Sequence, residues 1–279
     1  MTARSPHVEV ARAWALEERR HVGPFVTGER YRLPDGSHLS WNSRRHRKVG
    51  RAEERHVTLT HPWWQPRLLG WWIAVLFMIG SALFALGSFT PYANAFGAQA
   101  VGITYFVGSL FFTSAGYLQY LQAINAPTDL EGSSTRRRRF LAWQPQRIDW
   151  WAATVQSIGT LLFNRSTFNA LNAGLSAQQQ SKEIWRPDML GSIAFMVAST
   201  LAWMEVCHGW GRWDPRDTSW RIVALNLGGS IAFQVSAIAA FVEPQSGDMV
   251  NATLANTGTL VGAIGFFFGA LLLIPELAD

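Results

Sequence analysis

Six long apolar stretches, separated by short polar segments, make up most of the chain after residue 67. They cover residues 68–89, 98–123, 150–171, 189–206, 221–242 and 253–275, and they are almost free of charged side chains. Each has about the 20 residues that an α-helix needs to cross a hydrocarbon core. In lipid, backbone polar groups must be satisfied within each segment, so we predict an all-α membrane protein with six transmembrane helices.

A pattern of Trp, Gly and Phe recurs three times along this region. In each copy a second Trp follows the first by seven residues, a Gly follows nine residues later, and a Phe follows four residues after that. The three copies begin at Trp64, Trp143 and Trp213. Such regular recurrence predicts three parallel helical hairpins, residues 64–125, 143–207 and 213–275, around a pseudo-symmetry axis along the membrane normal.

The conserved offsets suggest structural roles. The Trp and Arg residues at the start of each copy are interpreted as interfacial anchors, with the indoles at headgroup depth. They are Trp64, Arg67, Trp71, Trp143, Arg147, Trp150, Trp213, Arg216 and Trp220. The Gly-Ser or Gly-Thr pair in each copy, for example Gly159-Thr160 and Gly229-Ser230, is expected to let helices approach closely.

These helix pairs with Gly-Ser-x-x-Phe cores resemble the YrhK-type two-helix membrane domain of bacterial proteins. Residues Trp143 to Phe168 and Trp185 to Phe195 resemble the central part of larger relatives, and the likeness covers about residues 64–275. The resemblance implies a small bacterial integral membrane protein without an assigned reaction, and it supplies no catalytic residues.

The distribution of charge predicts the orientation. Of 24 Lys and Arg residues, 13 lie in residues 1–67, and with the N-terminus inside, cytosolic segments carry 21 and outward segments three. This asymmetry predicts cytosolic N- and C-termini in the cytoplasmic (inner) membrane. Topology accounts for most of the positive charge behind the pI of about 9.9, so no nucleic-acid partner is expected.

Residues 1–62 are predicted to form a cytosolic N-terminal region, separate from the bundle of residues 63–279. A short amphipathic helix is expected from Ser5-Pro6 up to Gly23-Pro24, followed by a β-hairpin around Pro34-Asp35-Gly36. The basic run from Arg44 to Lys48 has two interpretations: a solvated topogenic run, or a specific site for anionic lipid or nucleic acid.

Polar residues share one face of the third and fifth predicted spans. This candidate polar interior face comprises Gln156, Thr160, Asn164, Arg165, Asn226, Ser230 and Gln234. The amides and hydroxyls are either hydrogen-bonding contacts between helices or the lining of a hydrated solute path. Arg165 either reaches outward to the interface or faces a polar cavity, with Glu243 as the expected acidic partner.

Other chemistry is weakly indicated. Glu205 and His208 share a helix face, but a metal site needs three or four ligands, and the remaining six His residues lie within the first 61 residues. We therefore expect no metal and no cofactor. Without a phosphate loop, a nucleophile elbow or paired intramembrane carboxylates, an enzyme is the weakest class.

Two functional hypotheses remain. In one, the protein is a scaffold or accessory subunit that binds the lipid bilayer, anionic lipid at its cytosolic face, and a membrane-protein partner or a second copy of itself. In the other, it is a small-solute transporter or channel, with an anion as one candidate solute, whose polar path follows the third and fifth helices.

Overall fold

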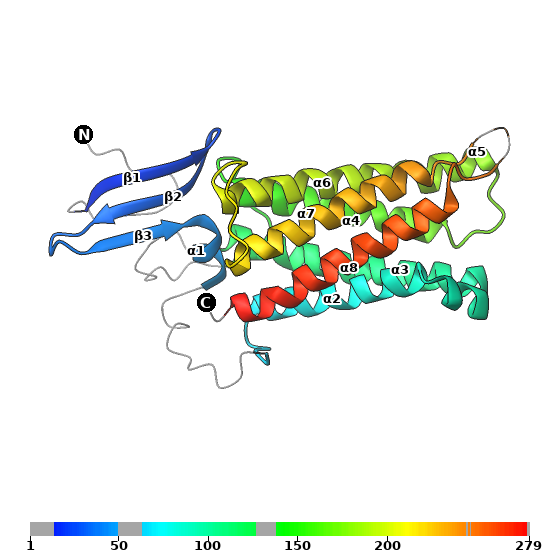
Figure 1. The fold of residues 1–279 in the computed structure, drawn as a ribbon, viewed down its shortest axis with the longest axis horizontal. Coiled ribbons are helices and arrows are strands. Elements are labelled where there is room, and N and C mark those ends of the chain that lie inside the picture. The colour runs from blue at the N-terminus through cyan, green and yellow to red at the C-terminus, as the bar shows by residue number, and fades with distance from the viewer. Residues whose placement is uncertain (1–13, 50–62, 127–137, 244, 246, 278–279) are drawn as a thin grey trace.

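The computed structural model describes residues 14–49, 63–126, 138–243, 245 and 247–277. Long helices lie side by side in a bundle, and a small sheet lies beyond one end of it (Figure 1). The long helices are α2 (Leu69–Gly87), α3 (Thr90–Ile124), α4 (Ile148–Asn169), α6 (Arg186–Cys207), α7 (Thr218–Ala239) and α8 (Ala252–Glu276). The short helix α5 (Ala177–Gln180) and the π-helical turn η2 (Ser181–Trp185) precede α6.

Consecutive helices pair in the bundle. The closest pairs are α2 with α3, α4 with α6, and α7 with α8, and further contacts of α2 with α8, α3 with α4 and α6 with α7 close the ring. Five helices in the described part of the chain are long and apolar enough to cross a membrane: α2, α3, Ala177–Cys207, α7 and α8. These helices indicate a multi-pass membrane protein in a lipid bilayer. The remaining predicted span corresponds to α4, which is as long as α7 but more polar.

The second predicted span begins earlier than expected. Residues 90–97, which separate the first two predicted spans, are largely helical, and α3 starts at Thr90 with Pro91 in its first turn. The helix is interrupted at Gly97, whose φ of 79° lies in the left-handed region that glycine tolerates best. The chain therefore turns at this glycine before the long apolar part of α3.

Six phenylalanine rings form the centre of the bundle. Phe84, Phe163 and Phe233 lie with their ring centroids 6.2 to 6.4 Å apart in all three pairs. Phe112, Phe195 and Phe266 form a second set, with centroids 5.5 to 6.2 Å apart. Because all six side chains are at most 7% exposed, the two sets make a continuous apolar plug across the bundle.

Paired glycines bring the helices of each hairpin together. A Cβ atom added to Gly229 would lie 2.9 Å from the backbone oxygen of Gly262, which is closer than real contacts allow. The same approach occurs between the glycines at 80 and 108, at 3.1 Å, and at 191 and 159, at 3.2 Å. Small residues thus allow the backbones of two helices to touch. In a membrane this close packing stabilises the helix pair, because lipid removes the hydrophobic driving force for helix association.

The described part of the N-terminal region is a three-stranded antiparallel sheet followed by a helix. Strands β1 (Ala15–Val22), β2 (Phe25–Arg32) and β3 (His38–Asn42) pair in the order β1-β2-β3, and α1 (Ser43–Val49) follows. The predicted hairpin corresponds to β2 and β3, whose turn contains Gly36 at a φ of 83°. Asp35 stabilises this turn by accepting a hydrogen bond from the Ser37 backbone N–H at 2.9 Å.

The predicted N-terminal helix is wrong over residues 15–22, which form β1, and its first part lies outside the described residues. β1 pairs with β2 through a tight turn in which Gly23 has a φ of 54°.

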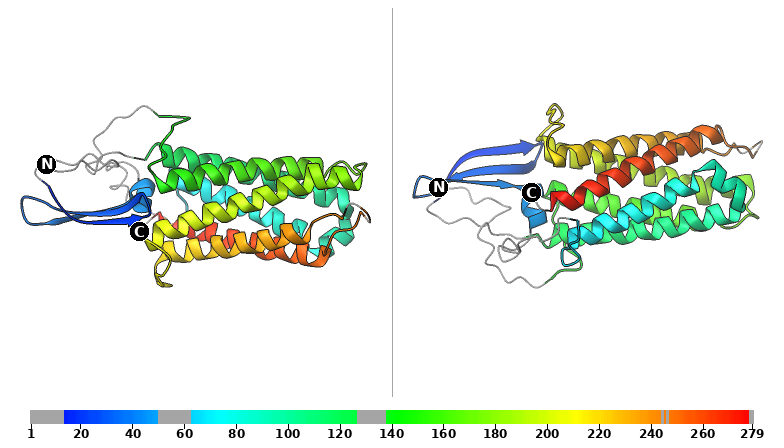
Figure 2. Two further views of the ribbon diagram at one scale, coloured as in Figure 1. Left: turned by 90° about the horizontal axis from the view of Figure 1, so that it is seen from above. Right: turned by 60° about the horizontal axis from the view of Figure 1, so that its bottom comes forward.

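Two further views show that the sheet and α1 lie beyond the end of the bundle where α8 ends (Figure 2). Thr27 of β2 contacts His208, which follows α6, through a 2.8 Å hydrogen bond between Oγ1 and Nδ1.

Candidate functional site

A cavity of about 70 Å³ lies inside the bundle at the end that carries α1. Charged residues of α1, α4 and α6 line its mouth, and carboxamide side chains line its walls. Phe77 and Phe266 line its apolar inner part, so the cavity ends at the phenylalanine plug. One water needs roughly 10–15 Å³ on this measure, so the cavity can hold several waters or one small solute.

Helix α1 directs three cations into the mouth of this cavity. Arg44, Arg47 and Lys48 are spaced i, i+3 and i+4, so they share one helix face. Their side chains are only 9%, 9% and 10% exposed. The side-chain oxygen of Asn42 accepts hydrogen bonds from the backbone N–H groups of Arg44 and Arg45, at 3.1 and 3.2 Å, and so caps the start of α1.

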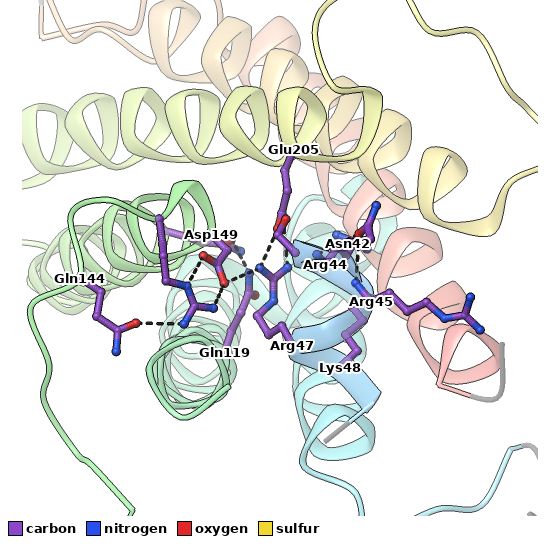
Figure 3. A network of polar contacts seen from close by, with 12 residues as sticks. Asn42, Arg44, Arg45, Arg47, Lys48, Gln119, Gln144, Asp149 and Glu205 are labelled. Atoms are coloured by element: carbon purple, nitrogen blue, oxygen red, sulfur yellow. Dashed lines mark hydrogen bonds and ion pairs between the residues drawn. The ribbon is translucent and has the colours of Figure 1, made fainter. Parts of the chain in front are cut away.

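Arg47 bridges two buried carboxylates from different helices. Its guanidinium donates to Glu205 of α6 at 3.1 and 3.3 Å and lies 3.0 Å from Asp149 of α4. Figure 3 shows Arg47 between the two acids. Asp149 also accepts from Arg147, at 3.0 and 2.5 Å, and Glu205 accepts from the Ser43 hydroxyl at 2.6 Å. Both carboxylates are only 1% exposed, so their charges depend on these partners.

Arg44 and Lys48 share a third carboxylate, that of Glu276 at the end of α8. Arg44 donates to it through Nε and Nη2, at 2.8 and 3.2 Å, and Lys48 donates to its second oxygen. The Ser219 hydroxyl of α7 adds a hydrogen bond at 2.6 Å. The ionic cluster, defined as these four cations Arg44, Arg47, Lys48 and Arg147 with the three acids Asp149, Glu205 and Glu276, thus joins α1 to three helices of the bundle.

The pKa values of the α1 cations reflect this burial. Burial lowers the pKa of Arg44 to about 10, and the neighbouring Arg47 cation adds to the effect. Burial also holds the pKa of Lys48 well below its ordinary value, with Arg44 and Arg47 contributing. Burial opposes the charge of Arg47 as well, yet the carboxylates of Glu205 and Asp149 raise its pKa above the ordinary value. Burial thus outweighs the nearby carboxylates at Arg44 and Lys48, whereas the carboxylates outweigh burial at Arg47.

Four carboxamides line the cavity below the charges. Gln119 donates to Gln156 at a long 3.4 Å. Gln122 and Asn226 also face the cavity, and neither side chain has a hydrogen-bonding partner among the residues that the structure describes. The walls therefore offer donors and acceptors to a bound molecule or to water.

The candidate polar interior face divides between the cavity and the packed bundle. Gln156 and Asn226 line the cavity. Thr160 and Ser230 are fully buried, and their hydroxyls are satisfied within the bundle: Thr160 donates to a backbone oxygen at 2.7 Å, and Ser230 lies 2.7 Å from the Ser199 hydroxyl. Farther from the cavity, Gln234 lies 3.0 Å from the Met189 sulfur. The buried Oδ1 of Asn164 has no partner in the described part of the chain.

Arg165 lies apart from the cavity. Its side chain is 58% exposed, and its Nη2 lies 2.6 Å from Glu183 of η2. The expected pairing with Glu243 is therefore replaced by one with Glu183. The exposed pair is a surface contact rather than part of an interior site.

The predicted anchor residues occupy two kinds of position. The second Trp of each copy is buried, and its indole N–H donates to the backbone oxygen eight residues earlier, at 2.9 to 3.0 Å: Trp71, Trp150 and Trp220. The first Trp of each copy is 68 to 78% exposed: Trp64, Trp143 and Trp213. Arg67 and Arg216 are exposed, whereas Arg147 belongs to the ionic cluster.

No group of three or more metal-ligating side chains occurs within the described residues. Glu205, considered above with His208, instead binds Arg47, and His208 contacts the sheet. Burial lowers the pKa of His208, and the Arg20 and Arg212 cations add to this effect.

Sequence reasoning missed the role of α1. The run from Arg44 to Lys48 was interpreted as solvated or lipid-binding, but three of its cations are buried against acids of the bundle. Two features of the sequence could have revealed this. Three acids lie at the ends of helices that carry few other charges, and one basic face of α1 has the i, i+3, i+4 spacing.

A buried cavity whose mouth is filled by side chains of the chain's own N-terminal region is thus the feature to which function can be assigned. Comparisons with models of protein families, with curated proteins and with solved structures found no match to this chain.

Proposed function

We propose that this protein is a non-enzymatic scaffold or accessory subunit of the cytoplasmic (inner) membrane. In this proposal α4 also spans the bilayer, so six helices form three parallel hairpins with both termini in the cytosol. Support for the hairpins comes from the glycine contacts and from the Trp hydrogen bonds, which recur at the same offsets in each copy.

The observation that carries the proposal is the phenylalanine plug. Two sets of three rings fill the centre of the bundle where a transport path would have to pass. Thr160 and Ser230 have no exposed surface, so their hydroxyls serve packing rather than hydration in this arrangement. A closed interior in which these two hydroxyls have partners favours a binding role over conduction.

The N-terminal region gives such a scaffold a cytosolic surface. The ionic cluster fixes α1 to the bundle, and the sheet before it extends past the helix ends. A membrane-protein partner or a second copy of the chain would meet this surface or the small-residue faces of the helices. Exposed Arg67 and Arg216 at the same end suit anionic headgroups.

A small-solute transporter or channel is the second candidate, and one observation favours it. Gln156 and Asn226, both from the candidate polar interior face, line a cavity that opens toward the predicted cytosolic end. In this alternative the phenylalanine rings would separate to connect the cavity to the outer side, and α1 would leave the mouth.

Accessibility of single cysteines separates the two functions. Thr160→Cys and Ser230→Cys are made in a Cys207→Ser background and treated with a membrane-impermeant thiol reagent from each side. We expect neither to be labelled, because the plug and the packed helices exclude water. Exposed positions near each end, Arg216→Cys and Gln178→Cys, serve as controls that must be labelled.

Labelling of both buried positions at the rate of the controls would contradict the scaffold and favour the transporter. The same controls test topology, since Arg216→Cys should react only from the cytosol and Gln178→Cys only from outside. Labelling of both controls from one side would refute a transmembrane α6, and reversed sidedness of both would refute the cytosolic termini.

A further inference from the structure

The ionic cluster has more hydrogen-bond donors than its acids can accept. All six carboxylate oxygens of Asp149, Glu205 and Glu276 already accept at least one hydrogen bond from Arg, Lys or Ser side chains. By contrast, Nη1 of Arg44 and Nε of Arg47 have no acceptor among the described residues, and Lys48 uses one acceptor for three N–H groups. Every carboxylate oxygen is thus used as an acceptor, whereas several donor groups are not used.

The ionic cluster also has more positive charges than negative charges. The cluster contains four cations and three acids, and all of its side chains are at most 17% exposed. Asp217 acts on Arg44 through space, but it is 30% exposed and lies 3.3 Å from Arg212. A buried net positive charge is unfavourable, and a bound anion would remove it.

The cavity beside the cluster supplies the space and further donors. Arg44, Arg47 and Lys48 line it together with Gln122 and Asn226, whose carboxamide N–H₂ groups have no acceptor in the described part of the chain. Its volume of about 70 Å³ suits an anion of three or four heavy atoms. A phospholipid headgroup is too large for it, and a divalent anion would reverse the excess charge.

We propose that this cavity binds a small monovalent anion, a short carboxylate or a halide, between the α1 cations and the carboxamides of Gln122 and Asn226. This site goes beyond the scaffold function and does not depend on it. The anion completes the ionic cluster and so strengthens the docking of α1 and the sheet to the bundle.

The test measures thermal unfolding of the full chain in a non-ionic detergent, with formate replacing gluconate at constant pH and ionic strength. Gluconate is too large for the cavity. We expect the unfolding temperature to rise with formate and then to saturate, since a ligand that binds only the folded state stabilises it by mass action. Half-saturation should lie on the order of 1 mM or weaker, because so few atoms limit affinity. A chloride series shows whether halides share the site.

Two variants locate the effect. Lys48→Gln removes the excess charge, and Gln122→Glu adds the missing carboxylate within the cavity, so both should abolish the rise with formate. Gln122→Glu should also unfold at least as high in gluconate as the parent protein does in saturating formate. Arg45→Gln, on the exposed side of α1, should keep the full response.

Identical unfolding in formate, chloride and gluconate would overturn the proposal. A rise with formate that persists in Gln122→Glu would also overturn it, because the anion would then bind elsewhere. If Lys48→Gln fails to fold, Gln122→Glu still decides the question, since it removes no existing contact of the cluster.

Discussion

Replacing Arg47 with Met should release the N-terminal region from the bundle. The Arg47 side chain is 9% exposed and lies against two carboxylates that are 1% exposed. Without it, Asp149 keeps Arg147, but Glu205 keeps only the Ser43 hydroxyl. Removing one partner from a buried ion pair typically costs about 3–5 kcal/mol, because the other charge remains buried and uncompensated.

This loss should appear as local undocking, since the bundle retains its phenylalanine plug. Every 1.4 kcal/mol is a factor of ten, so the docking equilibrium should weaken by roughly 100- to 4,000-fold. Hydrogen exchange of amides in α1 and β2, at fixed pH, measures this directly, because opening exposes them. Amides of α7 should exchange at the parent rate. Arg45→Met, on the same helix but exposed, should change exchange less than about fivefold.

A double variant tests the physical cause. Arg47→Met combined with Glu205→Met removes the uncompensated charge together with its partner, so exchange should be slower than in Arg47→Met alone. Parent-like exchange of α1 in Arg47→Met would refute the role of the ionic cluster. The single variant Glu205→Met completes the comparison. If the double variant exchanges as fast as the product of the two single-variant effects predicts, the two charges act independently.

Three further outcomes follow from single contacts. Gly229→Ala should destabilise the bundle by about 1–3 kcal/mol in thermal unfolding, because its Cβ would lie 2.9 Å from the Gly262 backbone oxygen. The control Gly228→Ala, whose Cβ would have no atom within 4 Å, should be neutral or slightly stabilising. Burial lowers the pKa of His208 from its ordinary value of about 6.5, so docking of the sheet should be strongest above about pH 6.5 and weaken as the pH falls through the folded pKa. Hydrogen exchange of β2 measures this pH dependence. The variant His208→Asn should lose it, since Asn tolerates the left-handed backbone at this position. Arg165→Gln should change thermal stability by less than about 1 kcal/mol, since its pair with Glu183 is exposed, and a larger loss would place Arg165 in an interior site.

The helical hairpins could be anticipated from sequence because their signals are local. Apolar length predicts each helix, and the recurrence of Trp and Gly at fixed offsets indicates which segments are alike. Thr160 and Ser230 were placed on an interior face by periodicity alone, and both are fully buried. A helix face is a property of one segment, so it can be read without knowing the neighbours.

Strand β1 could not be anticipated in this way. Its sequence, ALEERRHV, contains good helix formers and lacks a regular alternation, and most of its residues are exposed at the edge of the sheet. Pairing with β2 through the tight turn at Gly23 overrides that local preference. The partner strand, rather than the residues of β1 themselves, determines the structure of this segment.

The ionic cluster was missed for a different reason. The contacts of α1 with Glu205 and Glu276 join residues 158 to 232 positions apart, and no local pattern connects Arg47 to Glu205 or Arg44 to Glu276. A run of basic residues is normally solvated or topogenic, so composition pointed away from burial. The cavity could not be foreseen either, because Gln156 and Asn226 face it only through the way in which α4 and α7 pack with their neighbours.

Differences between the three hairpins explain how α1 docks in one orientation. The residues ten positions after Phe112, Phe195 and Phe266 are Gln122, Glu205 and Glu276, so two hairpins present an acid at this level and the first presents an amide. Because Gln122 carries no charge and forms no ion pair, Arg47 pairs with Glu205, and Arg44 and Lys48 pair with Glu276. The same amide leaves the cluster one carboxylate short, so the feature that selects the orientation of α1 also creates the space and charge for the proposed anion.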